Sequence, residues 1–174
     1  MTKARQFAAL MVMAALAPLP AAAAPLEDII AGNFTATGIN RLKPGEPAER
    51  VFCRLAGTKT GDATFDLSGR CATANVSGRM QIGLTVTAPG TRYELDVTVA
   101  MAKLAGYASS YHYTGTADAS GATFVTPFTL DGKQYRSSFR ISYGAEGIDR
   151  IVETVTAAAD GAKTVLVDLK VKRE

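Results

Sequence analysis

Two cysteines, Cys53 and Cys71, are the residues of this 174-residue chain whose chemistry follows most directly from type and spacing. They bracket the segment CRLAGTKTGDATFDLSGRC, and the chain has no other cysteine. An even cysteine count is compatible with a disulfide if the chain is exported, as its N-terminus predicts below, because oxidising compartments preserve such bonds. The pair is centred on Asp62, in the turn-like KTGDA, so a hairpin folded there places the two sulfurs opposite each other. We therefore predict a structural disulfide, since the Cys-x-x-Cys spacing of redox enzymes is missing.

No other residues form a catalytic or metal-binding pattern. His112 is the only histidine, and the alternation of SSYHYTG places it on the polar face of a strand. One histidine and two paired cysteines do not complete a zinc site. Glu94 and Asp96 share an outward face, and the chain has neither a glycine-rich phosphate loop nor a nucleophile elbow. We predict that the protein is not an enzyme and uses no metal or cofactor.

Tyrosines gather on the apolar faces of the predicted strands. A tyrosine combines an apolar ring with a hydrogen-bonding tip, as a small-molecule pocket requires, although ordinary core positions use it too. The candidate ligand-binding tyrosines are Tyr93, Tyr111, Tyr113, Tyr135 and Tyr143.

Two arginines form a second candidate site. Arg136 and Arg140 lie on one face of a predicted strand with Ser138 between them. Guanidinium groups bind phosphates and carboxylates in a bidentate manner, so the pair is a candidate anion site. The alternative is that both arginines simply cover the outer face of the strand.

Alternating hydrophobicity predicts the elements that position these residues. Segments 79–87 (RMQIGLTVT) and 92–101 (RYELDVTVAM) alternate strictly and are joined by a Pro-Gly turn, which indicates a β-hairpin. Segments 134–143 and 164–172 alternate in the same way, and in the latter Val165, Val167, Leu169 and Val171 are expected to face inward. Asp-Gly and Ser-Gly dipeptides supply hairpin turns between the strands. Pro127 cannot donate to a ladder, so its strand is predicted to be an edge or to carry a bulge there.

These elements predict a single all-β domain over residues 24–174. Nine to ten antiparallel strands with mostly short connections favour an up-and-down barrel, with a β-sandwich as the alternative. The exception to the short connections is the proline-rich segment 41–50, which is expected to be an exposed loop. A helical turn before the first strand, over PLEDIIAG, is expected to end at Gly32.

The N-terminus has the pattern of a signal peptide. Lys3 and Arg5 precede an apolar run of eleven residues, too short to span a membrane, and small residues follow. Cleavage after Ala23 removes residues 1–23 and leaves 17 basic and 16 acidic residues, which do not indicate nucleic-acid binding. We predict a periplasmic location. Membrane barrels have aromatic girdles and long extracellular loops, so the absence of tryptophan, the final LKVKRE and the short connections argue against stable membrane insertion as a barrel.

Three short motifs carry resemblances to known families. GNFTATG, with Phe34 at the usual tryptophan position, is similar to the first strand of calycin barrels such as lipocalins. That resemblance implies an aromatic at the barrel floor. The cysteine hairpin resembles small periplasmic metalloprotease-inhibitor barrels, and CRLAG with FDLSGRC resembles a group of small uncharacterised exported bacterial proteins. The expected function is binding of a small apolar or lipid-like ligand inside the barrel. The alternative is an envelope interaction or inhibitor protein with a filled barrel.

Overall fold

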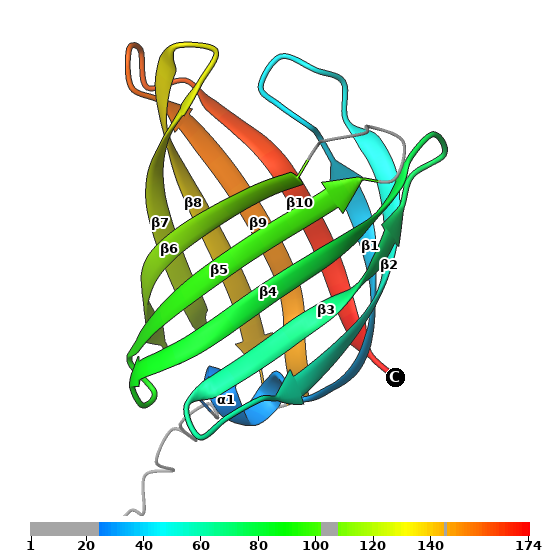
Figure 1. Ribbon diagram of the computed structural model, residues 1–174, viewed down its shortest axis with the longest axis vertical. Coiled ribbons are helices and arrows are strands. Elements are labelled where there is room, and N and C mark those ends of the chain that lie inside the picture. Colours follow the sequence, from blue (N-terminus) through cyan, green and yellow to red (C-terminus); the bar gives the residue numbers. More distant parts are fainter. Residues whose placement is uncertain (1–24, 102–107, 145) are drawn as a thin grey trace, which may run out of the picture.

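The computed structural model describes residues 25–101, 108–144 and 146–174 and shows a closed antiparallel barrel with strands in up-and-down order (Figure 1). The predicted barrel is confirmed, and the sandwich alternative is wrong. The predicted leader, residues 1–23 with cleavage after Ala23, lies outside the described residues. The ten strands are β1 (Gly32–Asn40), β2 (Glu49–Lys59), β3 (Thr64–Ala72), β4 (Ser77–Ala88), β5 (Arg92–Met101), β6 (Ala108–Asp118), β7 (Gly121–Leu130), β8 (Lys133–Gly144), β9 (Gly147–Ala157) and β10 (Lys163–Arg173).

The barrel closes where the two ends of the chain meet. β1 pairs with β2 on one side and with β10 on the other, and Gly38 faces Leu169 across the closing ladder. Because side chains alternate along each strand, one face of every strand points inward and forms a single core. Phe34, Leu95, Phe124 and Ile141 are among its fully buried members.

A short helix, α1 (Leu26–Ile29), plugs the lower end of the barrel as drawn in Figure 1. Leu26, Ile29 and the following Ile30 are buried. The Glu27 carboxylate anchors the plug, since it accepts hydrogen bonds from the Tyr93 hydroxyl (2.5 Å) and from the Gly90 N–H (3.0 Å). Burial and the adjacent Glu27 raise the pKa of Tyr93, so this tyrosine stays a neutral donor. The lower half of the barrel is therefore packed and closed.

Phe34 also lies in this packed lower half. Its ring is 1% exposed, and the Arg173 guanidinium lies over it at 5.7 Å from the ring centroid. Arg173 also donates a hydrogen bond to the Ala31 carbonyl, which ties the end of β10 to the start of β1. The aromatic expected at the barrel floor is therefore present.

The disulfide between Cys53 and Cys71 is present. The two cysteines are direct partners in the β2–β3 ladder, and the hairpin turns between Lys59 and Thr64, around the predicted centre. The predicted pairing and register are confirmed.

Strand β10 differs from the predicted alternation. The β9–β10 register shifts between Val165 and Val167, and this bulge turns Leu166 inward. Val165 is instead 39% exposed, so the expectation that it faces inward is wrong. A bulge inserts one extra residue into the ladder, and regular alternation cannot reveal it.

The wall between β6 and β7 is only partly hydrogen-bonded. The described pairing runs from Asp118–Gly121 to Thr114–Val125 and stops there. The second pair beyond Thr114–Val125 in this register would be His112 with Pro127, and proline has no N–H to donate. Beyond Val125, β7 pairs only with β8, so the edge predicted at Pro127 is confirmed.

The described helix α1 has four residues, and no helix in the described ranges is long and apolar enough to cross a membrane.

Candidate functional site

The upper half of the barrel, away from α1, contains two adjoining pockets with volumes of about 190 Å³ and 490 Å³. Asn40, Leu42, Glu46, Val99 and Val167 line both, so the pockets meet inside one mouth. The volume of the larger pocket is in the range of small-molecule sites, roughly 300–1,000 Å³. The sequence therefore fills the lower barrel with side chains but leaves space in the upper barrel.

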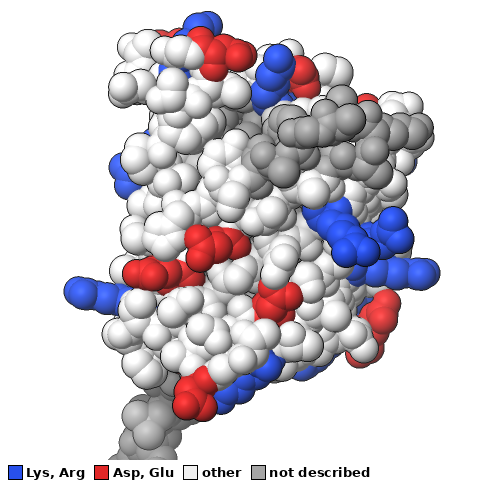
Figure 2. All heavy atoms as spheres, in the orientation of Figure 1, with Lys and Arg blue, Asp and Glu red and all other residues white. Residues whose placement is uncertain are grey.

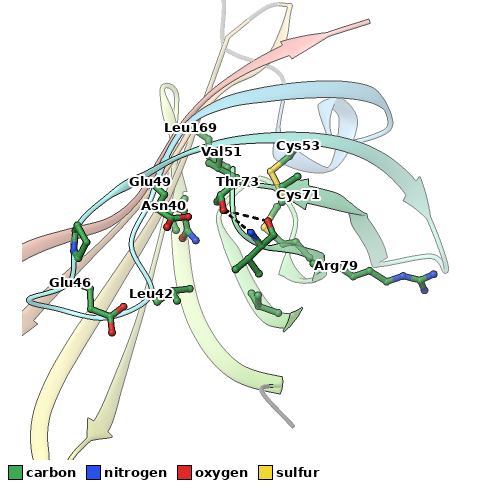
Figure 3. A pocket seen from close by; sticks show the side chains of 17 residues that line it. Asn40, Leu42, Glu46, Glu49, Val51, Cys53, Cys71, Thr73, Arg79 and Leu169 are labelled. Carbon is green, nitrogen blue, oxygen red and sulfur yellow. Dashed lines mark hydrogen bonds between the residues drawn. A yellow bond between two sulfur atoms is a disulfide. The ribbon is translucent and has the colours of Figure 1, made fainter. Parts of the chain in front are cut away.

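The smaller pocket is lined mainly by apolar groups from β2, β3, β4 and β10. Figure 3 shows the Cys53–Cys71 disulfide beside it, with Val51 and Leu169 on the same side. Polar side chains, among them Asn40 and Glu49, lie near its outer edge. The disulfide thus fixes the register of the two strands that form this wall.

A polar cluster lies at the base of the larger pocket, with Tyr113 and Ser137 buried and Glu153 half-buried. Glu153 on β9 accepts hydrogen bonds at Oε1 from the Ser137 hydroxyl on β8 (2.9 Å) and the Tyr113 hydroxyl on β6 (3.1 Å). The two hydroxyl oxygens are 3.2 Å apart, and Ser137 is 1% exposed. All three side chains line the pocket, and below them Phe139 and Ile151 are buried. One carboxyl group therefore lies at the boundary between the packed core and the cavity.

Burial shifts the titration of this cluster. Removal from water raises the pKa of Glu153 above its ordinary value, and the hydrogen bonds from Ser137 and Tyr113 offset only part of that effect. Burial, and then the nearby Glu153, also raise the pKa of Tyr113, so its hydroxyl remains a donor at neutral pH. The cluster has no positively charged member among the described residues.

Replacing Glu153 with glutamine is expected to stabilise the protein more at neutral pH than at acid pH. A raised carboxyl pKa means that the folded state binds more protons than the unfolded state between the two pKa values. The contribution of Glu153 to folding is thus fully present below its ordinary pKa of 4.5 and is lost as the pH rises through the raised value. Urea unfolding of both proteins at about pH 4 and about pH 7.5 measures the difference. Glu94→Gln, on the outer face, is the control for the loss of one charge. An equal pH dependence for the two variants would contradict the burial of Glu153.

The five candidate tyrosines separate into two groups. Tyr111 and Tyr113 line the larger pocket. Tyr93 and Tyr143 are buried in the packed lower half, where their hydroxyls bond to Glu27 and to the Asp118 carbonyl. Tyr135 lines a separate depression at the upper rim and stacks on Phe128 at 5.4 Å between ring centroids. Alternation placed all five rings on inward faces but could not indicate at which height the cavity begins.

Aromatic side chains contact each other where the β6–β7 backbone pairing is missing. Tyr111 of β6 and Phe128 of β7 meet edge to face, with their ring centroids 5.8 Å apart, and both line the larger pocket. Side-chain contact therefore replaces backbone hydrogen bonds in this part of the cavity wall.

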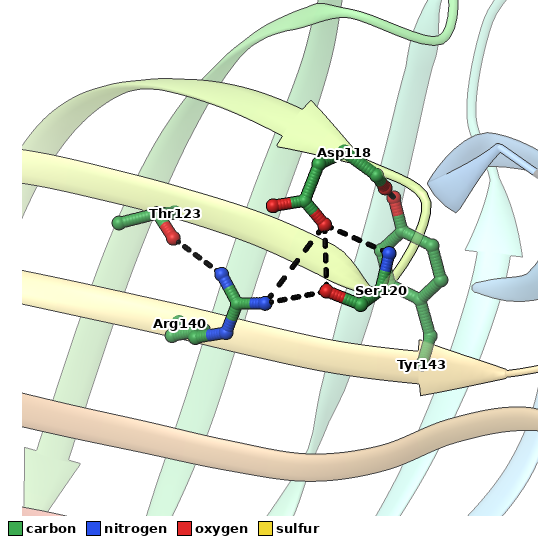
Figure 4. A network of polar contacts seen from close by, with 5 residues as sticks. All are labelled: Asp118, Ser120, Thr123, Arg140 and Tyr143. Carbon is green, nitrogen blue, oxygen red and sulfur yellow. Dashed lines mark hydrogen bonds and ion pairs between the residues drawn. The ribbon is translucent and has the colours of Figure 1, made fainter.

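The candidate anion pair does not form a joint site. Arg140 donates to the hydroxyls of Thr123 (2.8 Å) and Ser120 (3.0 Å) and lies 3.9 Å from the Asp118 carboxylate (Figure 4). Arg136 is exposed and pairs with Pro127 and Thr156 in the ladders. The Arg140 guanidinium is thus engaged in holding the β6–β7 turn, while Arg136 lies on the outer face.

His112 lies on the outer face, where its Nδ1 is 2.8 Å from the Asp96 carboxylate of the neighbouring strand. Both side chains are more than half exposed. No group of three or more His, Cys, Asp or Glu side chains within the described ranges is arranged to hold a metal ion.

A row of arginines on the outer wall was not predicted from the sequence. Arg54, Arg70 and Arg79 are direct ladder partners on β2, β3 and β4, and no acidic group in the described ranges lies within ion-pair distance of them. Figure 2 shows basic side chains gathered on that side of the molecule. The cysteine register contained the signal, because a hairpin that pairs Cys53 with Cys71 must also pair Arg54 with Arg70.

Glu153 and Ser137 were likewise not predicted as site residues. In RIVETV, Glu153 stands between Ile151 and Val155 at period two, and Ser137 stands likewise between Tyr135 and Phe139. A polar residue at an inward position of an alternating run was the available signal.

Comparison of the chain with protein-family models, with curated proteins and with solved structures finds no match in any of the three.

Proposed function

We propose that this protein is an exported binding protein that holds a small, mostly apolar molecule in the upper half of its barrel. The observation that carries the proposal is the cavity itself, which is apolar over most of its wall and has one carboxyl cluster at its base. An apolar pocket with a few convergent polar groups is the usual form of a small-molecule site.

The difference in packing between the two halves of the barrel supports a ligand-binding interior rather than one filled by side chains. The lower half is closed by α1 and by fully buried rings such as Phe34 and Phe124. The upper half uses the same alternating strands, yet the side chains there leave space. The alternative, an interaction protein with a filled barrel, has less support because the upper interior contains this cavity.

Export and a water-exposed outer wall are part of the proposal. The disulfide suits an oxidising compartment such as the periplasm. Charged side chains, among them Arg54, Arg70 and Asp96, lie in the middle of the outer faces, where a lipid-facing wall disfavours them.

Native mass spectrometry of the mature protein purified from its own compartment tests the proposal. We expect an additional mass that is released on denaturation. Val99→Phe should lose most of that mass, because Val99 lines both pockets and a larger ring occupies their junction. Thr98→Phe, the neighbouring residue on the outer face of β5, is the matched control and should retain it. A bare protein mass, or equal retention by both variants, would contradict binding in the cavity.

A further inference from the structure

The carboxylate of Glu153 lies inside the cavity without a cationic partner. No lysine or arginine of the described residues lies within ion-pair distance of it, and its contacts are the neutral hydroxyls of Tyr113 and Ser137. A buried carboxylate is ordinarily paired with a cation, since removal from water is costly for an unpaired charge. The site therefore has a carboxyl group without a cationic partner next to apolar walls.

The hydrogen bonds at Glu153 leave one oxygen available. Both hydroxyls donate to Oε1, and among the described residues no donor is bonded to Oε2. Because Glu153 lines the larger pocket, Oε2 is the acceptor that a bound molecule can use. Tyr113 and Ser137 hold the carboxyl group from two other strands, so the acceptor is positioned before any ligand binds.

Two cations of the described rim residues, Arg41 and Lys43, are engaged by neighbouring groups. The Arg41 guanidinium donates to the carbonyls of Val165 and Glu46. Lys43 lies 3.7 Å from the Glu46 carboxylate, in an exposed ion pair. These groups lie on the rim loop, whereas Glu153 is the charged side chain at the base of the pocket.

The contacts of Glu153 determine which polar group of a bound molecule is favoured next to its carboxyl group. A ligand cation beside Glu153 favours the ionised carboxylate and gains a charge-assisted hydrogen bond, which offsets part of the desolvation of both groups. An alcohol offers only a neutral hydrogen bond, and a carboxylate is repelled by the like charge.

We infer that the cavity selects cationic amphiphiles, with an ammonium group on Glu153 Oε2 and an apolar chain along the Val99 and Val167 walls. The inference rests on the proposed function, because it assigns a ligand class to the same cavity.

The test is calorimetric titration of the mature protein with decylammonium, 1-decanol and decanoate below their micelle concentrations, near neutral pH. The three probes carry unbranched alkyl chains of nine or ten carbons and differ mainly in the head group. We expect decylammonium to bind at least about tenfold more tightly than 1-decanol, and decanoate to bind most weakly. Equal affinities, or tightest binding of decanoate, would overturn the inference while leaving the proposed function intact. Failure of all three probes to bind would overturn the proposed function as well.

Two matched variants locate the ammonium group. Glu153→Gln should bind 1-decanol as before and lose the preference for decylammonium to within about twofold. Glu94→Gln removes one carboxylate from the outer face of β5 and should retain the preference. Retention of the preference by Glu153→Gln, or an equal loss in both variants, would overturn the assignment to Glu153. Thermal unfolding of both variants verifies that each is folded in the titration.

Discussion

Replacing Gly38 with alanine is expected to destabilise the barrel by about 3 kcal/mol or more, because the added methyl group has no room. A Cβ at this position would lie 1.8 Å from the Asp168 carbonyl oxygen and 3.0 Å from the Leu169 Cα. Both atoms belong to the backbone of β10, so no side chain can rotate away and the closing ladder must separate. Denaturant unfolding measures the loss, and hydrogen exchange should show it first in β1 and β10.

Gly83→Ala is the matched control for this prediction. Gly83 also lies within a strand, but its nearest neighbours would be 3.9 Å from an added Cβ. Replacement of a glycine by alanine, where the backbone conformation and the available space permit it, typically stabilises a protein by about 0.4–1 kcal/mol. The reason is that alanine lowers the conformational entropy of the unfolded chain. The two variants should therefore change stability in opposite directions. A similar small change in both would show that β1 and β10 are not in close contact.

Removal of the Cys53–Cys71 disulfide is expected to lower the free energy of unfolding by about 3 kcal/mol. The two cysteines are 18 residues apart in sequence, and the loop they close includes the β2–β3 turn. For a chain of this size, the loss corresponds to a decrease in Tm of roughly 6–12 °C. Thermal unfolding of the double variant Cys53→Ala, Cys71→Ala measures it.

Reduction of the wild-type protein distinguishes the stability contributed by the disulfide bond from the stability contributed by packing of the two sulfur atoms. Cys53 is buried, so the double variant also loses apolar contacts beside the smaller pocket. The reduced wild type keeps both sulfurs and should show most of the same decrease in Tm. The double variant should not respond to reductant. Unchanged stability of the reduced protein would show that β2–β3 pairing alone maintains the register.

The local elements of this fold follow from patterns that act over a few residues. Strict alternation in segments 79–87 and 92–101 predicted the β4–β5 hairpin. The cysteine spacing predicted the β2–β3 register, and Pro127 predicted the edge in β7. The bulge at Val165 escaped prediction because an extra residue in one strand depends on the partner strand.

By itself, the sequence determined the all-β class, the hairpins, the inward faces and the disulfide, since each follows from side-chain period or turn chemistry within neighbouring segments. Only the tertiary structure decided that β1 closes on β10, where the absence of a side chain at Gly38 lets two distant backbones meet. It also decided which inward residues meet at one height. Tyr113, Ser137 and Glu153 come from three strands and converge only when the barrel closes, and the same closure separates the packed tyrosines from those that line the cavity. Period two specifies the face of a strand on which a residue lies, whereas its neighbours across the barrel depend on strand order, stagger and closure.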